Sequence, residues 1–164
     1  MKKKTAYLGV FLAFALILSY VESLIPFYFG IPGAKLGLAN LAVILVLYLY
    51  GVREALLLNV MRVLLSGFLF GNMFAILYGM AGALCSFLIM CILKKTKKFS
   101  MVGVSIGGGV FHNIGQILIA VFVTETAGVF YYIPVLFIAG LITGFLIGMV
   151  AGKVRKHLEK AIMN

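Results

Sequence analysis

The sequence predicts an all-α integral membrane protein with six transmembrane helices. Hydrophobic residues make up 64% of the chain and charged residues only 11%, whereas about a quarter of the residues in a soluble domain are charged. The mean hydropathy is +1.19. Apolar runs recur along the chain that are long enough to cross a hydrocarbon layer of about 30 Å, at about 1.5 Å per helical residue. These observations favour the membrane class over any soluble one.

The first predicted span covers residues 5–22 and follows the basic start "MKKK". No convincing small-residue cleavage site ends it and further apolar runs follow, so we interpret it as a retained helix and not as a signal peptide. The next segment, "IPFYFGIPGAKLG", contains prolines and glycines that cannot continue a regular helix. We therefore expect a structured loop over residues 23–35.

The other spans are separated by short or basic segments. "YGVRE" (50–54) is a tight connection, "FGN" (70–72) barely separates two runs, and "KKTKK" (94–98) ends another. The predicted spans after the first are 36–51, 54–71, 73–93, 101–123 and 129–151. We expect all six to belong to one domain, residues 1–164.

The basic residues predict which side of the membrane each end faces. Twelve of the 14 lie in segments that share one side of the predicted topology: 1–4, 52–54, 94–100 and 152–164. The opposite side holds Lys35, Glu22 and Glu125, and Arg62 lies within the third span. By the positive-inside rule, both termini are predicted to be cytoplasmic, in a multi-pass protein of the cell membrane.

Several functions are excluded or disfavoured by composition. The net charge of +10 follows the topology, so it indicates attraction to anionic membrane lipid and not a nucleic-acid partner. Cys85 and Cys91 show no metal-ligand spacing, and "GVSIGGG" (103–109) lacks the ending of a phosphate loop. The chain has no aspartate and no Ser/His/acid arrangement. We therefore predict no catalytic residue, no metal site and no cofactor.

Small residues at a spacing of four predict where helices pack closely, because helices in lipid associate mainly through such contacts. The pairs are Gly9 and Ala13, Gly79 and Ala83, Gly140 and Gly144, and Gly144 and Gly148.

Arg62 is the most informative single residue. It lies about 13 Å into its span, near the bilayer midplane. A lone charge there costs about 2.5–3.5 kcal/mol on insertion scales, so we expect it to face the protein interior and to be paired. Asn59 and Ser66 lie on the same side of that helix as Arg62.

Further polar residues fall between the midplane and the outer surface. "FHNIGQ" (111–116) places polar groups in the middle of the fifth span, and polar groups in lipid are expensive unless they meet one another or a ligand. We therefore predict a cavity open to the outer face that binds a small anionic or amphipathic molecule. The predicted substrate-binding residues are Lys35, Asn40, Asn59, Arg62, Ser66, Asn72, His112, Asn113 and Gln116.

Structural roles are the alternative for these residues. Arg62 would then pair with helix carbonyls, His112 would lock the bundle, and the amides would serve packing or capping. Glu22 and Glu125 are expected near the outer boundary, so no carboxylate is predicted at the depth of Arg62, which argues against a proton-coupled pump. A passive channel is disfavoured because the polar residues thin out on the inner half.

Four segments, in this order, resemble a known family: "IPGAKLGLANL" (31–41), "RVLLSGFLFGN" (62–72), "GVFHNIGQ" (109–116) and "YIPVLFIAGLITGFLIG" (132–148). The chain resembles the Gx transporter family, also catalogued as heptaprenyl diphosphate synthase component I. That family is similar to the substrate-binding (S) components of energy-coupling factor (ECF) transporters. The resemblance implies a six-helix bundle that binds a small solute near the outer face.

The resemblance also implies partners, namely a transmembrane coupling subunit and ATPase subunits. S components meet the coupling subunit through small residues on the first helix, and here Ala6, Gly9 and Ala13 occupy such positions. The synthase name implies an alternative, a non-catalytic accessory or scaffold protein of isoprenoid or quinone biosynthesis. Prenyl diphosphate synthesis itself needs Mg²⁺ held by aspartate-rich motifs, and this chain has no aspartate.

Overall fold

The structure is a computed structural model that describes residues 2–24 and 37–163. Within these ranges the chain is helical and contains no strand, which confirms the predicted all-α class for this part. The elements, in chain order, are α1 (Lys2–Leu24), α2 (Asn40–Leu49), α3 (Val52–Phe70), α4 (Met73–Thr96), α5 (Met101–Thr124), the 3-10 helix η1 (Ala127–Tyr132) and α6 (Ile133–Met163).

Four of the six described α-helices are long and apolar enough to span a membrane, which supports the predicted membrane class. The qualifying segments are Lys3–Leu24, Met73–Thr96, Met101–Thr124 and Gly128–Lys160. α3 carries Arg53, Glu54 and Arg62, and α2 has only 10 residues. A complete set of six spans therefore stays a prediction.

The second predicted span, 36–51, is longer than the helix found there. α2 begins at Asn40 and ends at Leu49, so its length is about 15 Å, half of a hydrocarbon layer. Glycines lie just outside it in conformations that a helix does not use, with φ of +80° at Gly37 and +110° at Gly51. Backbone geometry at these two glycines sets the limits of the helix, and hydropathy alone does not reveal it.

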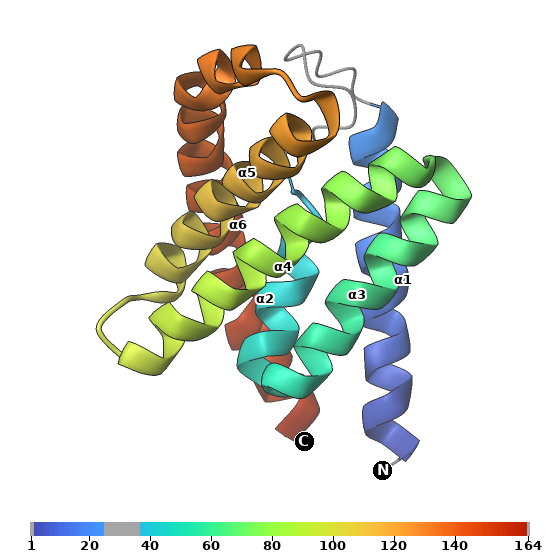
Figure 1. Ribbon diagram of the computed structural model, residues 1–164. Helices are drawn as coiled ribbons and strands as arrows, with labels where there is room; N and C mark the ends of the chain where they lie inside the picture. Colours follow the sequence, from blue (N-terminus) through green and yellow to red (C-terminus); the bar gives the residue numbers. More distant parts are fainter. Residues whose placement is uncertain (1, 25–36, 164) are drawn as a thin grey trace.

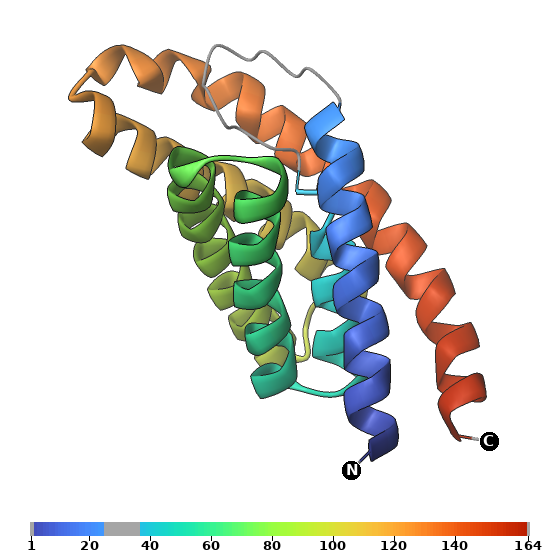
Figure 2. The same cartoon turned by 90° about the vertical axis from the view of Figure 1, so that its right-hand side faces the viewer.

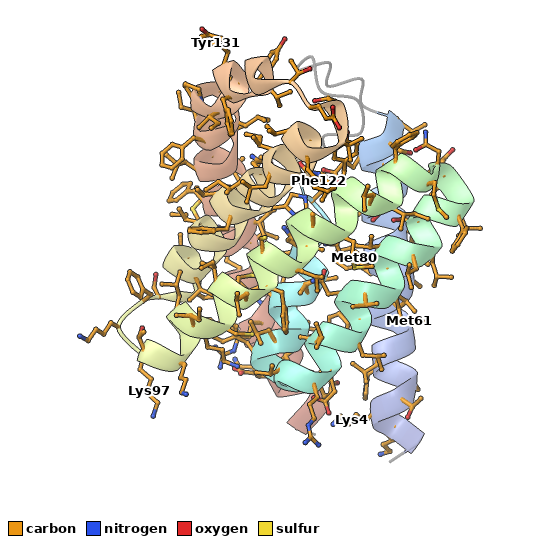
Figure 3. The ribbon with its side chains drawn as sticks, viewed as in Figure 1. Lys4, Met61, Met80, Lys97, Phe122 and Tyr131 are labelled. Carbon is orange, nitrogen blue, oxygen red and sulfur yellow. The ribbon has the colours of Figure 1, made fainter. Side chains whose placement is uncertain are left out.

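The helices run between two ends of the bundle that differ in charge. The start of α1 and the end of α6 lie at one end, together with the α2–α3 turn and the α4–α5 connection (Figure 1). We call this the basic end, because it carries the lysines and arginines of segments 2–4, 52–54, 94–100 and 152–163. Figure 3 shows Lys4 and Lys97 toward this end and Tyr131 at the other. The side of the membrane that the basic end faces stays a prediction.

α2 forms the centre of the bundle. Its residues from Ala42 to Leu47 are at most 1% exposed, and it packs against α1, α3, α6 and α5. Its sequence, "NLAVILVLYL", is apolar on every face, which suits a helix surrounded by others. Figure 2 shows the α3–α4 hairpin on one side of α1 and α6 on the other.

Glycines allow α5 and α6 to approach closely. A Cβ atom at Gly109 would lie 2.5 Å from the Gly140 carbonyl oxygen, and one at Gly144 would lie 2.7 Å from the Ile106 Cα. Gly148 likewise faces the Val102 backbone. The predicted contacts at Gly140, Gly144 and Gly148 are confirmed, since only small residues permit such short distances.

The other two predicted pairs differ from each other. A Cβ at Gly79 on α4 would lie 3.3 Å from the Val63 side chain of α3, so this glycine does mark a helix contact. Gly9 on α1 has nothing within 4 Å of its Cβ position, and Ala13 is exposed. The expected close contact at Gly9 and Ala13 is therefore not made by the described residues, and this face of α1 stays open.

Candidate functional site

The Arg62 side chain lies inside the bundle and links three helices. It is 5% exposed, its Nη2 donates to the Asn40 Oδ1 at the start of α2 (2.9 Å), and its Nε donates to the Asn59 Oδ1 one turn earlier on α3 (3.0 Å). The Asn59 Nδ2 in turn donates to the Ala83 carbonyl oxygen of α4 (3.0 Å). Both asparagines therefore orient the guanidinium.

Glu22 of α1 supplies a negative charge to the same region. Its side chain is 5% exposed, accepts hydrogen bonds from the backbone N–H groups of Gly37 and Leu38, and acts electrostatically on Arg62. The expectation that no carboxylate lies at the depth of Arg62 is therefore wrong. The chain at Gly37 folds back into the bundle against the end of α1, which encloses the carboxylate together with the guanidinium.

These groups surround a small cavity, which we call the Arg62 cavity. Its polar lining comes from Ser19, Glu22, Arg62, Ser66 and His112. Its volume is about 10 Å³, which is room for about one water molecule, whereas pockets for solutes measure about 300–1,000 Å³. A solute can bind here only if the helices around the cavity move apart.

His112 of α5 lines this cavity, and Gln116 follows it one turn later on the same face of the helix. A Cβ at Gly82 of α4 would lie 2.8 Å from the His112 carbonyl oxygen and 2.9 Å from the Gln116 Cγ. A Cβ at Gly37 would lie 3.4 Å from the His112 Cδ2. These glycines leave space for the polar face of α5 to approach α4 and the segment before α2.

Gln116 has no hydrogen-bond partner for either end of its amide within the described residues, although it is only 1% exposed. Buried polar groups are nearly always hydrogen-bonded, and leaving one unsatisfied costs about 1–3 kcal/mol. The amide presents one acceptor and two donor hydrogens. Chemically, this side chain can bind a group that both donates and accepts.

Two predicted site residues lie elsewhere and have structural partners. The Asn113 Nδ2 donates to the Leu136 carbonyl oxygen of α6 (2.7 Å), so this amide joins α5 to α6. Asn72 is exposed and caps α4, its Oδ1 accepting from the Ala75 N–H (2.9 Å). Lys35 and most of the expected loop over 23–35 lie outside the described residues.

Sequence reasoning missed two polar residues that line the Arg62 cavity, Ser19 and Glu22, as well as the lining residues Gly37, Val63, Ala75 and Gly79. Ser19 and Glu22 are three residues apart on α1, and this spacing puts two side chains on one face of a helix. This spacing was the sequence signal that could have placed both side chains at the same site. The predicted topology placed Glu22 near the outer boundary because it is the last residue of the first predicted span, 5–22.

The proposed docking residues lie together on the open face of α1. Ala6, Gly9 and Ala13 are all exposed, at positions i, i+3 and i+7 of the helix. Such a spacing forms a narrow stripe of small residues along one side.

Comparison with known families gives the affiliation of the chain. The family model described as heptaprenyl diphosphate synthase component I matches residues 11–154. The chain belongs to this family. The match to heptaprenyl diphosphate synthase component I includes Glu22, Arg62, His112 and Gln116, and begins after Ala6 and Gly9. No curated protein and no solved structure matches the chain. The family description names one component of a synthase, which is consistent with partner subunits.

Proposed function

We propose that this protein is the substrate-binding subunit of an uptake transporter in the cell membrane, similar to the S components of ECF transporters. It would take a small amphipathic or anionic molecule at the outer face, through the Arg62 cavity. The cavity lies toward the end opposite the basic end, since Ser66 and Ala75 are close to the α3–α4 connection (Figure 1). That end is predicted to face outward.

The observation that carries this proposal is the Gln116 amide. Its two polar atoms lack partners among the described residues at 1% exposure, and this arrangement is unfavourable for a side chain with a purely structural role. A solute that donates and accepts would satisfy it, with Arg62, His112, Asn40, Asn59 and Ser66 supplying the neighbouring polar contacts.

The charges refine the class of solute. Because the negative charge of Glu22 already acts on Arg62, negative charge of the solute alone is a weak basis for recognition. We therefore favour an amphipathic solute with an amide-like or carbonyl-rich polar edge over a simple anion. Lys35 would add a positive charge at the entrance.

The open face of α1 is the proposed contact surface for partner subunits. We propose that Ala6, Gly9 and Ala13 contact a transmembrane coupling subunit, which ATPase subunits drive. Small residues permit close helix contact in lipid, and a Cβ at Gly9 meets nothing within 4 Å in the described structure.

A matched pair of variants tests the solute site. Gln116→Leu removes the unpartnered amide, so we expect stability equal to or higher than that of the wild type. The amount of bound solute should fall by at least roughly tenfold. Asn113→Leu removes an amide three positions earlier on the same helix, and we expect a loss of about 1 kcal/mol in stability with solute retained. Native mass spectrometry of protein purified from its own membranes reads the bound solute. Equal solute content in wild type and Gln116→Leu would refute the site.

The second candidate is a non-catalytic accessory subunit of an isoprenoid or quinone enzyme, and the family description favours it. The Mg²⁺ for prenyl transfer would then be held by another subunit, because this chain has no aspartate. Affinity purification of the tagged chain separates the two functions. Co-purifying ATPases support the transporter subunit, and a co-purifying soluble prenyltransferase supports the accessory role.

A further inference from the structure

A second hollow lies at the basic end, away from the Arg62 cavity. It is an open groove of about 460 Å³ beside the end of α4 and the start of α3. We call it the lysine groove, and its lining consists of Val52, Cys91, Ile92, Lys94, Lys95 and Lys97.

The floor of the lysine groove is apolar and continues along α4. Val52 is 50% exposed and Ile92 is 49% exposed. Leu88 and Leu84 follow Ile92 at intervals of four residues and are 60% and 43% exposed. Residues four apart lie on one face of a helix, so an exposed apolar track leads from the groove toward the middle of α4.

The rim of the groove is positively charged. Lys94 is already engaged, because its Nζ donates to the Leu47 carbonyl oxygen (2.6 Å) and lies 4.8 Å from the centre of the Tyr48 ring. Lys95 and Lys97 are exposed. Lys97 ends α4 with a φ of +57°, where the chain turns away from the helix.

The chain has only four acidic residues, and none forms an ion pair with Lys95 or Lys97 in the described structure. Glu54 pairs with Lys4 (2.5 Å), and Glu159 pairs with Arg155 (2.7 Å). Glu22 lies at the Arg62 cavity. The fourth, Glu125, follows α5 at the opposite end. Among the described residues, no side-chain carboxylate supplies a counter-charge to these two lysines, so they are available to an external anion.

We propose that the lysine groove binds an anionic phospholipid of the leaflet at the basic end. Its phosphate lies against Lys95 and Lys97, and an acyl chain follows Ile92, Leu88 and Leu84. An apolar floor with a cationic rim matches this lipid class, because basic pockets beside transmembrane helices bind anionic headgroups. The proposal is independent of whether the chain serves a transporter or an enzyme.

The test compares two charge removals at the same end of the molecule. In K95Q/K97N the groove loses its rim, with asparagine chosen at 97 because it tolerates positive φ. In the control K153Q/K156Q, α6 loses the same charge from exposed positions. Each protein is placed in nanodiscs of phosphatidylcholine with or without phosphatidylglycerol, and retained lipid is counted by native mass spectrometry.

We expect wild type and K153Q/K156Q to retain phosphatidylglycerol in preference to phosphatidylcholine. K95Q/K97N should bind it more weakly by roughly fivefold for each lysine removed. An equal loss in both variants would mean general attraction to an anionic surface and would overturn the proposal. No preference in the wild type would overturn it as well.

Cys91 provides a second measurement inside the groove, because it is partly buried there and Cys85 is the only other cysteine. In a Cys85→Ala background, phosphatidylglycerol should slow maleimide alkylation of Cys91 several-fold more in wild type than in K95Q/K97N. Alkylation slowed to the same extent in both would contradict an occupied groove.

Discussion

At the residue scale, Arg62 depends on partners from several helices. Asn40 and Asn59 accept its hydrogen bonds, and Glu22 balances its charge. Removing one of two interacting buried charges is costly, since the remaining charge stays buried and uncompensated. A substitution of Arg62 therefore affects folding as well as solute binding. A substitution of Gln116 is expected to affect binding alone.

We expect Arg62→Met to lower the free energy of unfolding by about 3–5 kcal/mol, because it leaves Glu22 without its buried counter-charge. The double variant with Glu22→Gln should recover part of this loss, since both charges are then gone. Denaturant unfolding of the single and double variants in detergent measures the coupling. Strictly additive effects would show that the two side chains do not interact.

At the same scale, neighbouring residues of α5 differ in role. His112 lines the Arg62 cavity, Gln116 follows it on the same face, and Asn113 is bonded to α6. Successive helix residues point about 100° apart, so the polar cluster in the sequence divides between two interfaces.

At the element scale, α2 ends inside the bundle, and the Lys94 side chain satisfies one of its last carbonyl groups, that of Leu47. Helix ends leave such groups without partners within the helix. Lys94 and Arg155 also lie over the Tyr48 ring, at 4.8 and 5.0 Å from its centre. A short central helix is thereby attached to both α4 and α6.

We expect Lys94→Met to lower the free energy of unfolding by about 1 kcal/mol, because the Leu47 carbonyl loses its charged donor at a partly exposed site. Lys95→Met is the matched control, since its ammonium group makes no hydrogen bond or ion pair among the described residues. Thermal unfolding in detergent compares them. Equal stability of the two variants would mean that the Lys94 bond contributes nothing.

The α5–α6 interface gives a second expectation at this scale. Gly144→Ala should lower the free energy of unfolding by about 1–3 kcal/mol, because its Cβ would lie 2.8 Å from the Ser105 carbonyl oxygen and 2.7 Å from the Ile106 Cα. Backbone atoms cannot rotate away as a side chain can.

Gly152→Ala on the same helix is its control, with nothing within 4 Å of the added Cβ. It should raise stability slightly, because alanine is the better helix former. Denaturant unfolding in detergent measures the stability of both variants. Two equally destabilised proteins would contradict a specific contact at Gly144.

At the scale of the whole molecule, the difference in charge between the basic end and the opposite end predicts the orientation of the protein in the membrane. With both termini cytoplasmic, Tyr131→Cys should react with a membrane-impermeant thiol reagent added to intact cells, since Tyr131 is 88% exposed at the end opposite the basic end (Figure 3). Lys97→Cys should react only after the cells are opened. Both variants are made in a background without Cys85 and Cys91. The reverse labelling pattern would invert the proposed transport direction.

Local properties of the sequence were enough to predict the membrane class, most of the helical segments and the gathering of basic residues at alternate connections. These properties are local: hydropathy, helix-breaking residues and charge act over a few turns of one chain segment. It also indicated that Arg62 had to be buried and paired, because a charge in hydrocarbon is costly wherever the helix lies.

Which groups lie in contact depends on how the helices pack, and the sequence did not reveal it. Glu22 joins Arg62 because α1 packs beside α3 and the chain at Gly37 folds inward, and α2 is short because Gly37 and Gly51 take positive φ. Asn113 and Asn72 leave the predicted site because α6 and the α4 backbone offer them nearer partners. Contacts between helices depend on packing angles and backbone turns set by the whole chain, and a one-dimensional pattern contains neither.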